Sequence, residues 1–168
     1  MKEKNTVCQF KRVEEAHIPA LREIYLYYVN HSTATFHKRE ISLEEMRDLL
    51  IFENPKYESY GIWLENDLCG YVILTKYKER EAFEFSAEVT IYLKNGYEGR
   101  GIGSRAIQFI EERAKTKDIH TLLALICGEN TGSINLFEKN HYKRCAEYKE
   151  VGFKFNRWLD LLCYQKII

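Results

Sequence analysis

The sequence predicts a mixed α/β fold built around one sheet, and three observations support this. Apolar runs with the two-residue period of strands alternate with stretches of helical spacing. A glycine-rich loop at residues 96–104 separates such a run from a helical pattern. The 168-residue chain has only two prolines, Pro19 and Pro55, and no glycine- or serine-rich linker. Because 45% of the residues are hydrophobic, we expect a single domain over residues 1–168.

Two amphipathic helices are expected before the main sheet. Residues 7–13 alternate like a strand, and the helix after them has Pro19 in its first turn. The capping box of Ser42 and Glu45 starts the second helix. The apolar positions expected to face the core are Ile18, Leu21, Tyr25 and Tyr28 in the first helix and Leu43, Met46, Leu49 and Leu50 in the second.

Three strands are expected next. Residues 60–64 and 70–77 flank a turn at 65–67, which is typical of an antiparallel hairpin. The run at 85–93 is rich in β-forming residues. Val89, Ile91 and Leu93 fall on one of its faces, and Glu88, Thr90 and Tyr92 on the other.

The remaining elements give the order β-α-α-β-β-β-α-β-α-β-β. A helix is expected from Ser104 to about residue 116. Residues 122–127 are apolar on both faces, which is typical of a mid-sheet strand. A short helix starts at Asn130, and two last strands cover about 142–150 and 159–166. We expect Trp158 to lie in the core beside the last strand and Asp160 to lie in a turn.

Composition excludes several classes of protein. Equal numbers of acidic and basic residues, 25 each, argue against nucleic-acid and membrane partners. The odd number of widely spaced cysteines predicts buried free thiols, and the histidines lack ligand spacing, so no metal is assigned. No apolar run approaches the roughly 20 residues that span a bilayer, so we expect a cytoplasmic protein.

The glycine-rich loop is the strongest functional signal. Gly99, Gly101 and Gly103 permit positive φ and close approach to the backbone, and the helix after them offers unpaired N–H groups to an anion. The loop lacks the Lys of a P-loop and the third glycine of a dinucleotide fingerprint. A different phosphate ligand is therefore expected, although a plain strand-to-helix turn is the alternative.

Residues 98–103 match the Gln/Arg-x-x-Gly-x-Gly/Ala pattern of the GNAT superfamily of N-acetyltransferases in five of six places, with Glu98 at the first. The chain resembles that superfamily over nearly its whole length, and within it the phosphinothricin acetyltransferase-like branch. The segments that carry the likeness to the branch are His31–Phe36, Arg80–Phe83, Ser86–Glu88, Val151–Phe155 and Arg157–Asp160.

The resemblance implies an acetyl-CoA-dependent enzyme in which two central strands splay around the pantetheine arm, with no metal. It implies Glu88 as the general base, for which a solvated carboxylate is the alternative. Phe137 stands where many relatives have a tyrosine acid, so water or Tyr142 is expected to give the proton. Glu98 is expected to point away from the phosphates. The residues that the resemblance and the loop assign to the cofactor are Ile91, Tyr92, Leu93, Gly99, Arg100, Gly101, Ile102, Gly103, Ser104, Asn130 and Ser133, of which Asn130 and Ser133 are also explained as helix caps.

The resemblance also implies a small amino-acid-like amine acceptor of the phosphinothricin or methionine sulfoximine type. Phe36, Arg80 and Lys154 are expected to bind it. The alternatives are acetylation of a protein amine or lysine, and a non-catalytic acyl-CoA sensor. A homodimer formed through the C-terminal strands is expected by analogy with the family.

Overall fold

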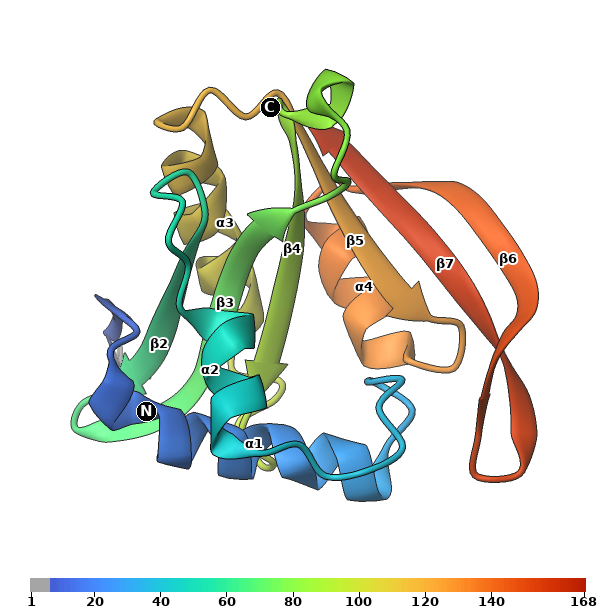
Figure 1. Cartoon of the computed structure of the whole chain (residues 1–168), viewed down its shortest axis with the longest axis horizontal. Helices are drawn as coiled ribbons and strands as arrows, with labels where there is room; N and C mark the ends of the chain where they lie inside the picture. The colour runs from blue at the N-terminus through green and yellow to red at the C-terminus, as the bar shows by residue number, and fades with distance from the viewer. Residues whose placement is uncertain (1–6) are drawn as a thin grey trace, which may run out of the picture.

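The computed structural model describes residues 7–168, which form one seven-stranded sheet with helices on both faces (Figure 1). The order of elements along the chain is the predicted one, with added 3-10 turns at Glu15–His17 and Glu81–Phe83. The elements are β1 Cys8–Arg12, α1 Ile18–His31, α2 Leu43–Leu50, β2 Glu58–Leu64, β3 Asp67–Lys76, β4 Ser86–Leu93, α3 Ile102–Lys115, β5 Thr121–Cys127, α4 Thr131–Lys139, β6 Lys143–Lys154 and β7 Arg157–Ile167.

The sheet separates two helical layers, with α1 and α2 on one face and α3 and α4 on the other (Figure 1). Neighbouring residues of β3 enter different cores because strand side chains alternate. Tyr71 packs with Met46 on the α1 and α2 side, and Val72 lies in the cluster with Ile107 on the α3 and α4 side. No helix within residues 7–168 is long and apolar enough to cross a membrane.

The capping box at the start of α2 is confirmed, but the predicted stripe of that helix is partly wrong. Ser42 Oγ accepts the Glu45 N–H at 3.1 Å, and the Glu45 carboxylate accepts the Ser42 N–H at 2.7 Å. Met46 and Leu50 are buried, whereas Leu43 is 51% exposed and Leu49 is 40% exposed. This short helix packs mainly on α1, so a narrow face suffices.

Two other predictions about burial need correction. Trp158 is 61% exposed, because it lies on the outer part of the β6–β7 hairpin rather than in the core. Cys145 is also exposed and Cys8 is half-buried, whereas the thiols of Cys69, Cys127 and Cys163 are buried as predicted. All of these cysteines are free.

Strands β4 and β5 are parallel neighbours only where they begin. Residues 86–88 pair with residues 121–123, and their pairing ends there. Beyond this point β4 stays with β3 and β5 stays with β7, so the two strands diverge (Figure 1). The expected splay of the central strands is therefore confirmed, and its fork begins at Glu88.

The β6–β7 hairpin projects beyond the rest of the sheet (Figure 1). Its turn places Phe155 and Asn156 at φ of 49° and 59°, the left-handed pair of a tight hairpin turn. The register shifts between Arg144 and Ala146 and again between Tyr148 and Gly152. Several large apolar side chains of this hairpin are exposed, namely Tyr148, Val151, Phe153, Phe155 and Trp158.

Candidate active site

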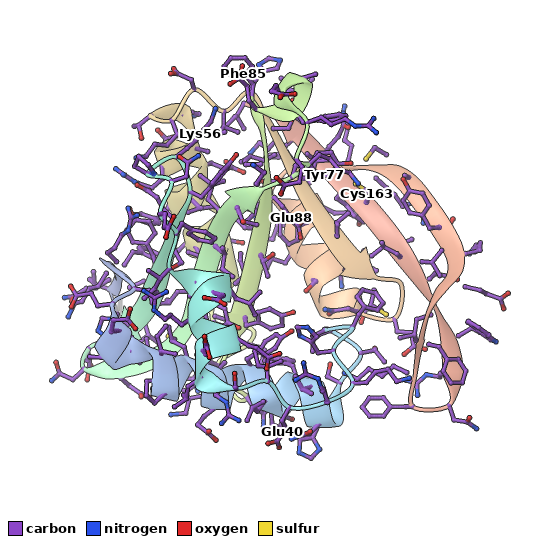
Figure 2. All side chains as sticks on the ribbon, in the orientation of Figure 1. Glu40, Lys56, Tyr77, Phe85, Glu88 and Cys163 are labelled. Carbon is purple, nitrogen blue, oxygen red and sulfur yellow. The ribbon has the colours of Figure 1, made fainter. Side chains whose placement is uncertain are left out.

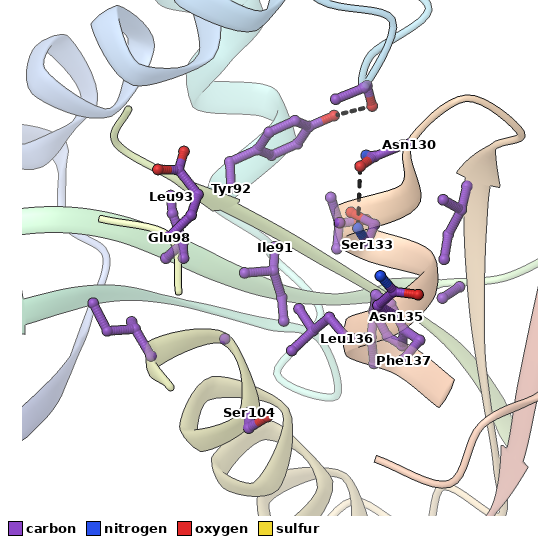
Figure 3. A pocket seen from close by; sticks show the side chains of 18 of the residues that line it. Ile91, Tyr92, Leu93, Glu98, Ser104, Asn130, Ser133, Asn135, Leu136 and Phe137 are labelled. Atoms are coloured by element: carbon purple, nitrogen blue, oxygen red, sulfur yellow. Dashed lines mark hydrogen bonds between the residues drawn. The ribbon is translucent and has the colours of Figure 1, made fainter. Parts of the chain in front are cut away.

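The divergence of β4 and β5 opens a cavity of about 500 Å³ (Figure 3). Its walls come from both strands, from the glycine loop with the start of α3, from one side of α4 and from the segment that follows α1. Of the eleven residues predicted to bind the cofactor, all except Arg100 line this cavity.

The glycine loop lines the cavity with backbone atoms that no side chain covers. Gly99 and Gly101 both have φ of +73°, and a Cβ built on either would find no heavy atom within 4 Å. Gly101 is the N-cap of α3 and places no side-chain oxygen on the N–H groups of the first turn. These N–H groups carry the positive end of the helix dipole, so the loop suits a pyrophosphate.

Gly103 has a different reason to be glycine. A Cβ at this position would lie 2.8 Å from Cδ2 of Leu136, so α3 and α4 approach each other closely here. The sequence pattern assigned Gly103 to phosphate binding alone. The structure adds a packing requirement between two helices that are distant in sequence.

The two charged residues of the loop lie in different settings, and only Arg100 departs from its expected place. The Arg100 guanidinium donates to the Gly96 carbonyl at 3.1 Å and lies over the ring of Tyr97, and Arg100 does not line the cavity. Glu98 does line it, and Figure 3 shows its carboxylate directed away from Ser104 and the start of α3, so its expected direction away from the phosphates stays a prediction. Its carboxylate accepts the Gly96 N–H at 2.8 Å, which draws the side chain back over its own turn.

Polar side chains on the two helices also reach the cavity. Asn130 Oδ1 accepts the Ser133 N–H at 3.1 Å, which confirms the predicted cap of α4 (Figure 3). The Ser104 hydroxyl accepts a bond of 3.0 Å from Asn140 Nδ2. Each of Ser104, Asn130 and Ser133 therefore has a structural bond and still lines the cavity.

The last turn of α1 and the loop beyond it close the cavity beside the end of β4. The Tyr28 hydroxyl donates to the Leu93 carbonyl, so this edge carbonyl already has a partner. Burial and the nearby Glu98 carboxylate raise the pKa of Tyr28 to about 12. The Tyr92 hydroxyl reaches Ala34 O at 3.3 Å and ties this wall to the strand.

Glu88 is half-buried at the start of the fork, on the face of β4 that carries Tyr92. Burial raises its pKa, and the Lys78 charge and a Thr90 hydrogen bond oppose that rise. Figure 2 shows Glu88 on the face of the sheet near Tyr77 and Cys163. The carboxylate is thus less solvated than an exposed one, which favours a proton-accepting group of useful basicity.

Sequence reasoning missed several neighbours of the site. Tyr77, Lys78 and Cys163 lie close enough to Glu88 for electrostatic influence, but the first two follow β3 and the third lies on β7. No local pattern brings these three together. In contrast, Asn135 and Lys139 line the cavity, and their helical spacing from Gly132 was a signal that could have found them.

Phe137 is buried and lines the cavity with a ring that has no proton to give. Its ring meets the Tyr142 ring edge to face, with centroids 5.0 Å apart. The Tyr142 hydroxyl is buried, lies near Glu111 and does not line the cavity, and burial raises its pKa. Of the two expected proton sources, water is the one that this geometry favours.

The three residues expected to bind the acceptor lie in different settings. Phe36 is 39% exposed and approaches Gly152, where an added Cβ would lie 2.9 Å from its ring. Arg80 is exposed just before the Glu81–Phe83 turn. Lys154 is buried and gives hydrogen bonds to backbone carbonyls, so its ammonium is already occupied.

Within residues 7–168, no three His, Cys, Asp or Glu side chains gather as ligands for a metal. The site instead combines a forked sheet, a glycine loop with a bare backbone at the start of α3 and a partly buried carboxylate where the fork begins. These features define an enzyme of the acyl-CoA-dependent acyltransferase class.

Comparison with known proteins agrees with this class. The family model described as acetyltransferase (GNAT) family matches residues 20–142, so the chain belongs to this family. It is an acetyl-CoA-dependent N-acetyltransferase, as the resemblance implied.

Individual relatives extend along almost the whole chain. A phosphinothricin N-acetyltransferase of Streptomyces coelicolor is 29% identical, over 90% of this chain and 91% of that protein. An L-methionine sulfoximine/L-methionine sulfone acetyltransferase of Pseudomonas aeruginosa is 27% identical, over 89% and 88%. The crystal structure of a GNAT superfamily phosphinothricin acetyltransferase from Sinorhizobium meliloti in complex with AcCoA has a TM-score of 0.90 and 25% identity, over 96% of this chain and 88% of that one.

Proposed function

We propose that this enzyme acetylates the primary amine of a small amino-acid-like acceptor, of the phosphinothricin or methionine sulfoximine type, by direct transfer with Glu88 as general base. The observation that carries the proposal is the place of Glu88. It is the last residue of β4 that pairs with β5, so its carboxylate lies where the fork opens. An amine entering from the α1 and α2 side meets this carboxylate beside the end of the cavity.

Glu88 has the properties that the proton transfer requires. A free α-amine has a pKa of about 7.7 to 8.0, so a modest base is enough near neutral pH. Burial raises the pKa of Glu88 and makes it a better acceptor, while the Lys78 charge limits the rise. Acetyl-CoA, when bound, supplies a thioester carbonyl that the neutral amine can attack.

The far end of the cavity fits the cofactor's phosphates. The N–H groups at the start of α3 and the bare Gly99 and Gly101 would hold the pyrophosphate. Ser104, Asn130 and Ser133 add polar groups along the walls. Around Ile91, β4 pairs with β3 on one side only, and its edge on the β5 side, where pairing ends at Glu88, would bind the pantetheine amides as a strand does.

The basic segment that follows β3, with Lys78 near Glu88 and Arg80 two residues on, supports an acceptor that carries a carboxylate. We propose that Arg80 pairs with it, with the charge of Lys78 close to the base. Phe36 forms an apolar wall. Lys154 is left out of the acceptor site because backbone carbonyls occupy its ammonium.

We also propose a homodimer formed through the C-terminal hairpin. The exposed apolar side chains of Phe153 and Trp158 support this, because such groups seldom face water in a group. Free thiols throughout residues 7–168 support a reducing compartment, the cytoplasm.

The test is an acceptor screen that measures release of CoA thiol from acetyl-CoA. Phosphinothricin, methionine sulfoximine and free amino acids are compared with their carboxamides and with short peptides. The free acids should react with the higher kcat/KM, since an amide offers no negative charge to the proposed partner Arg80. Faster acetylation of peptides would favour a protein substrate, and acetyl-CoA binding without turnover on any amine would favour a sensor.

A further inference from the structure

The loop between α1 and α2 forms a wall of the site but is not part of a helix or strand. Residues 32–36 of this segment, here called the 32–36 loop, follow the last turn of α1. Ser32 and Ala34 line the cavity, whereas Thr33 and Thr35 are buried. The shape of the cavity beside β4 therefore depends on what holds this loop.

One buried cation binds two backbone carbonyls of the loop and one of α1. Lys154 is 2% exposed, and its ammonium donates to Ser32 O at 2.6 Å, to Thr35 O at 2.9 Å and to Tyr28 O at 3.4 Å. An ammonium has three N–H donors, and all three have a partner here. These bonds join the last residue of β6 to the end of α1 and to both sides of the loop.

A second link reaches the same loop from the same hairpin. Arg157, just after the hairpin turn, forms two hydrogen bonds to the Glu129 carboxylate, at 2.9 Å and 2.7 Å. That carboxylate accepts a bond from Thr33 Oγ1 at 3.2 Å. Phe36 also packs against Gly152 of β6.

The other side of the loop contacts α1 and β4. Ala34 O receives the Tyr92 hydroxyl, and Thr35 Oγ1 lies 2.6 Å from the Tyr25 hydroxyl. Tyr92 follows Glu88 on the same face of β4 at a distance of four residues. The loop is thus held between the hairpin and the strand that carries the proposed base.

We propose that Lys154 is a positioning residue for the acceptor site, through which the β6–β7 hairpin fixes the 32–36 loop against β4. The inference rests on the proposed function, because it assigns this wall to acceptor binding. Lys154 acts through backbone carbonyls and does not touch the acceptor. Its loss should therefore change acceptor binding more than acetyl-CoA binding, whose phosphate end lies at α3.

The test compares Lys154→Met with Lys149→Met. Lys149 lies on the same strand, but its ammonium pairs with Glu147 and Asp160 at the surface instead of with carbonyls of the 32–36 loop. With methionine sulfoximine as acceptor, Lys154→Met should raise the acceptor KM roughly tenfold, as expected when buried partners lose a charged donor. The acetyl-CoA Kd and the kcat at saturating acceptor should change by less than about threefold, within the effect of a distant site.

Hydrogen exchange gives a readout that needs no activity. Amides of residues 32–36 should exchange faster in Lys154→Met, and amides of α3 should not. Lys149→Met should match the wild type in KM and in exchange. A folded Lys154→Met variant with wild-type acceptor KM and wild-type exchange in the loop would overturn the proposal.

A further variant covers the case in which Lys154→Met does not fold. Arg157→Met removes the exposed link through Glu129, and it should raise the acceptor KM and the exchange of the loop to a smaller extent. No change in either would also contradict the proposal. If wild-type enzyme fails to acetylate methionine sulfoximine, the substrate proposal fails, and exchange in the loop still decides the role of Lys154.

Discussion

At the scale of single residues, Glu88 is subject to opposing influences on its pKa. Burial at the fork raises the pKa, and the charge of Lys78 and the hydroxyl of Thr90 lower it. Burial has the larger effect, so the carboxylate ionises at a higher pH than an exposed glutamate. Its proton affinity therefore depends on a neighbour that sequence patterns do not connect with it.

Lys78→Met should move the acid limb of the pH profile of kcat/KM to higher pH. The base acts when ionised, so activity rises with pH through its pKa, and loss of a nearby cation raises that pKa further. Lys76→Met is the matched control, because Lys76 pairs with Glu79. If the acid limb stays in place or moves to lower pH, then either Glu88 is not the base or Lys78 does not lower its pKa.

Glu98→Gln should tighten acetyl-CoA binding by about two- to fivefold, as expected for an exposed charge pair. The change removes a negative charge from the cavity wall, and the glutamine oxygen can still accept the Gly96 N–H. Calorimetry at two salt concentrations checks this, because salt should reduce the gain. Weaker binding in the variant would mean that the carboxylate has a positive role.

The face of a strand on which a residue lies was easier to predict than the direction in which a loop or turn side chain points. The alternation of β4 placed Glu88 and Tyr92 on one face, as the structure has them. The directions of Glu98 and Lys154 depend on bonds to Gly96 and to the 32–36 loop. These bonds form only after the chain has folded, and no residue spacing in the sequence predicts them.

At the scale of elements, the glycine loop combines two kinds of requirement. Gly99 and Gly101 need positive φ and face open space, whereas Gly103 needs room for Leu136. The first requirement can be inferred from a glycine pattern between a strand and a helix. The second depends on how α3 meets α4, which the sequence alone does not give.

Gly101→Ala should weaken acetyl-CoA binding, and Gly96→Ala should not. Both residues have positive φ, of +73° and +90°, and a Cβ on either meets nothing within 4 Å. Each change should cost about 1–2 kcal/mol of backbone strain. Only Gly101 of this pair lines the cavity. Acetyl-CoA affinity measured by calorimetry therefore distinguishes a loss of cofactor contacts from the effect of backbone strain. Equal losses of affinity in the two variants would contradict the assigned phosphate cradle.

At the scale of the whole molecule, Glu58 joins elements from both halves of the chain. Its carboxylate is 1% exposed and contacts Arg12 at 2.8 Å, Arg113 at 2.9 Å and Lys117 at 3.0 Å. Burial alone would raise its pKa, but bonds from Arg113, Lys117 and Tyr60 outweigh burial and hold the pKa at about 2. The cluster links β1 and β2, at one edge of the sheet, to the last turn of α3 and the residues just after it.

Glu58→Gln should lower the free energy of unfolding at pH 7 by about 3 kcal/mol, the size expected for a pKa that lies well below the unfolded value near 4.3. A lowered folded pKa stabilises the protein above the unfolded pKa, and this contribution is lost as pH falls toward 2. Urea unfolding between pH 7 and 3 should therefore show a flatter stability curve in the variant. Glu112→Gln, at an exposed pair, should stay within about 0.5 kcal/mol of wild type. Wild-type stability and pH dependence in Glu58→Gln would contradict this role.

The order of elements could be predicted from local patterns, because the strand period, the helix period and the capping box each involve residues close together in the sequence. The fork also agrees with the resemblance, but its starting point does not follow from any local pattern. It depends on register between strands more than 30 residues apart, Glu88 with Leu123, and on β7 entering beside β5. The exposed Trp158 was mispredicted for a similar reason, since the hairpin leaves the body of the sheet.

The central claim is that Glu88, at the start of the fork, is the base of an acetyl-CoA-dependent amine acetylation. The most direct measurement is CoA release by Glu88→Gln with methionine sulfoximine at pH 7, together with its acetyl-CoA affinity. Turnover should fall roughly 10²- to 10⁴-fold, the usual contribution of a general base, with affinity unchanged. Part of the activity should return at high pH, where the amine loses its proton unaided. Wild-type turnover in a folded Glu88→Gln enzyme would contradict the account.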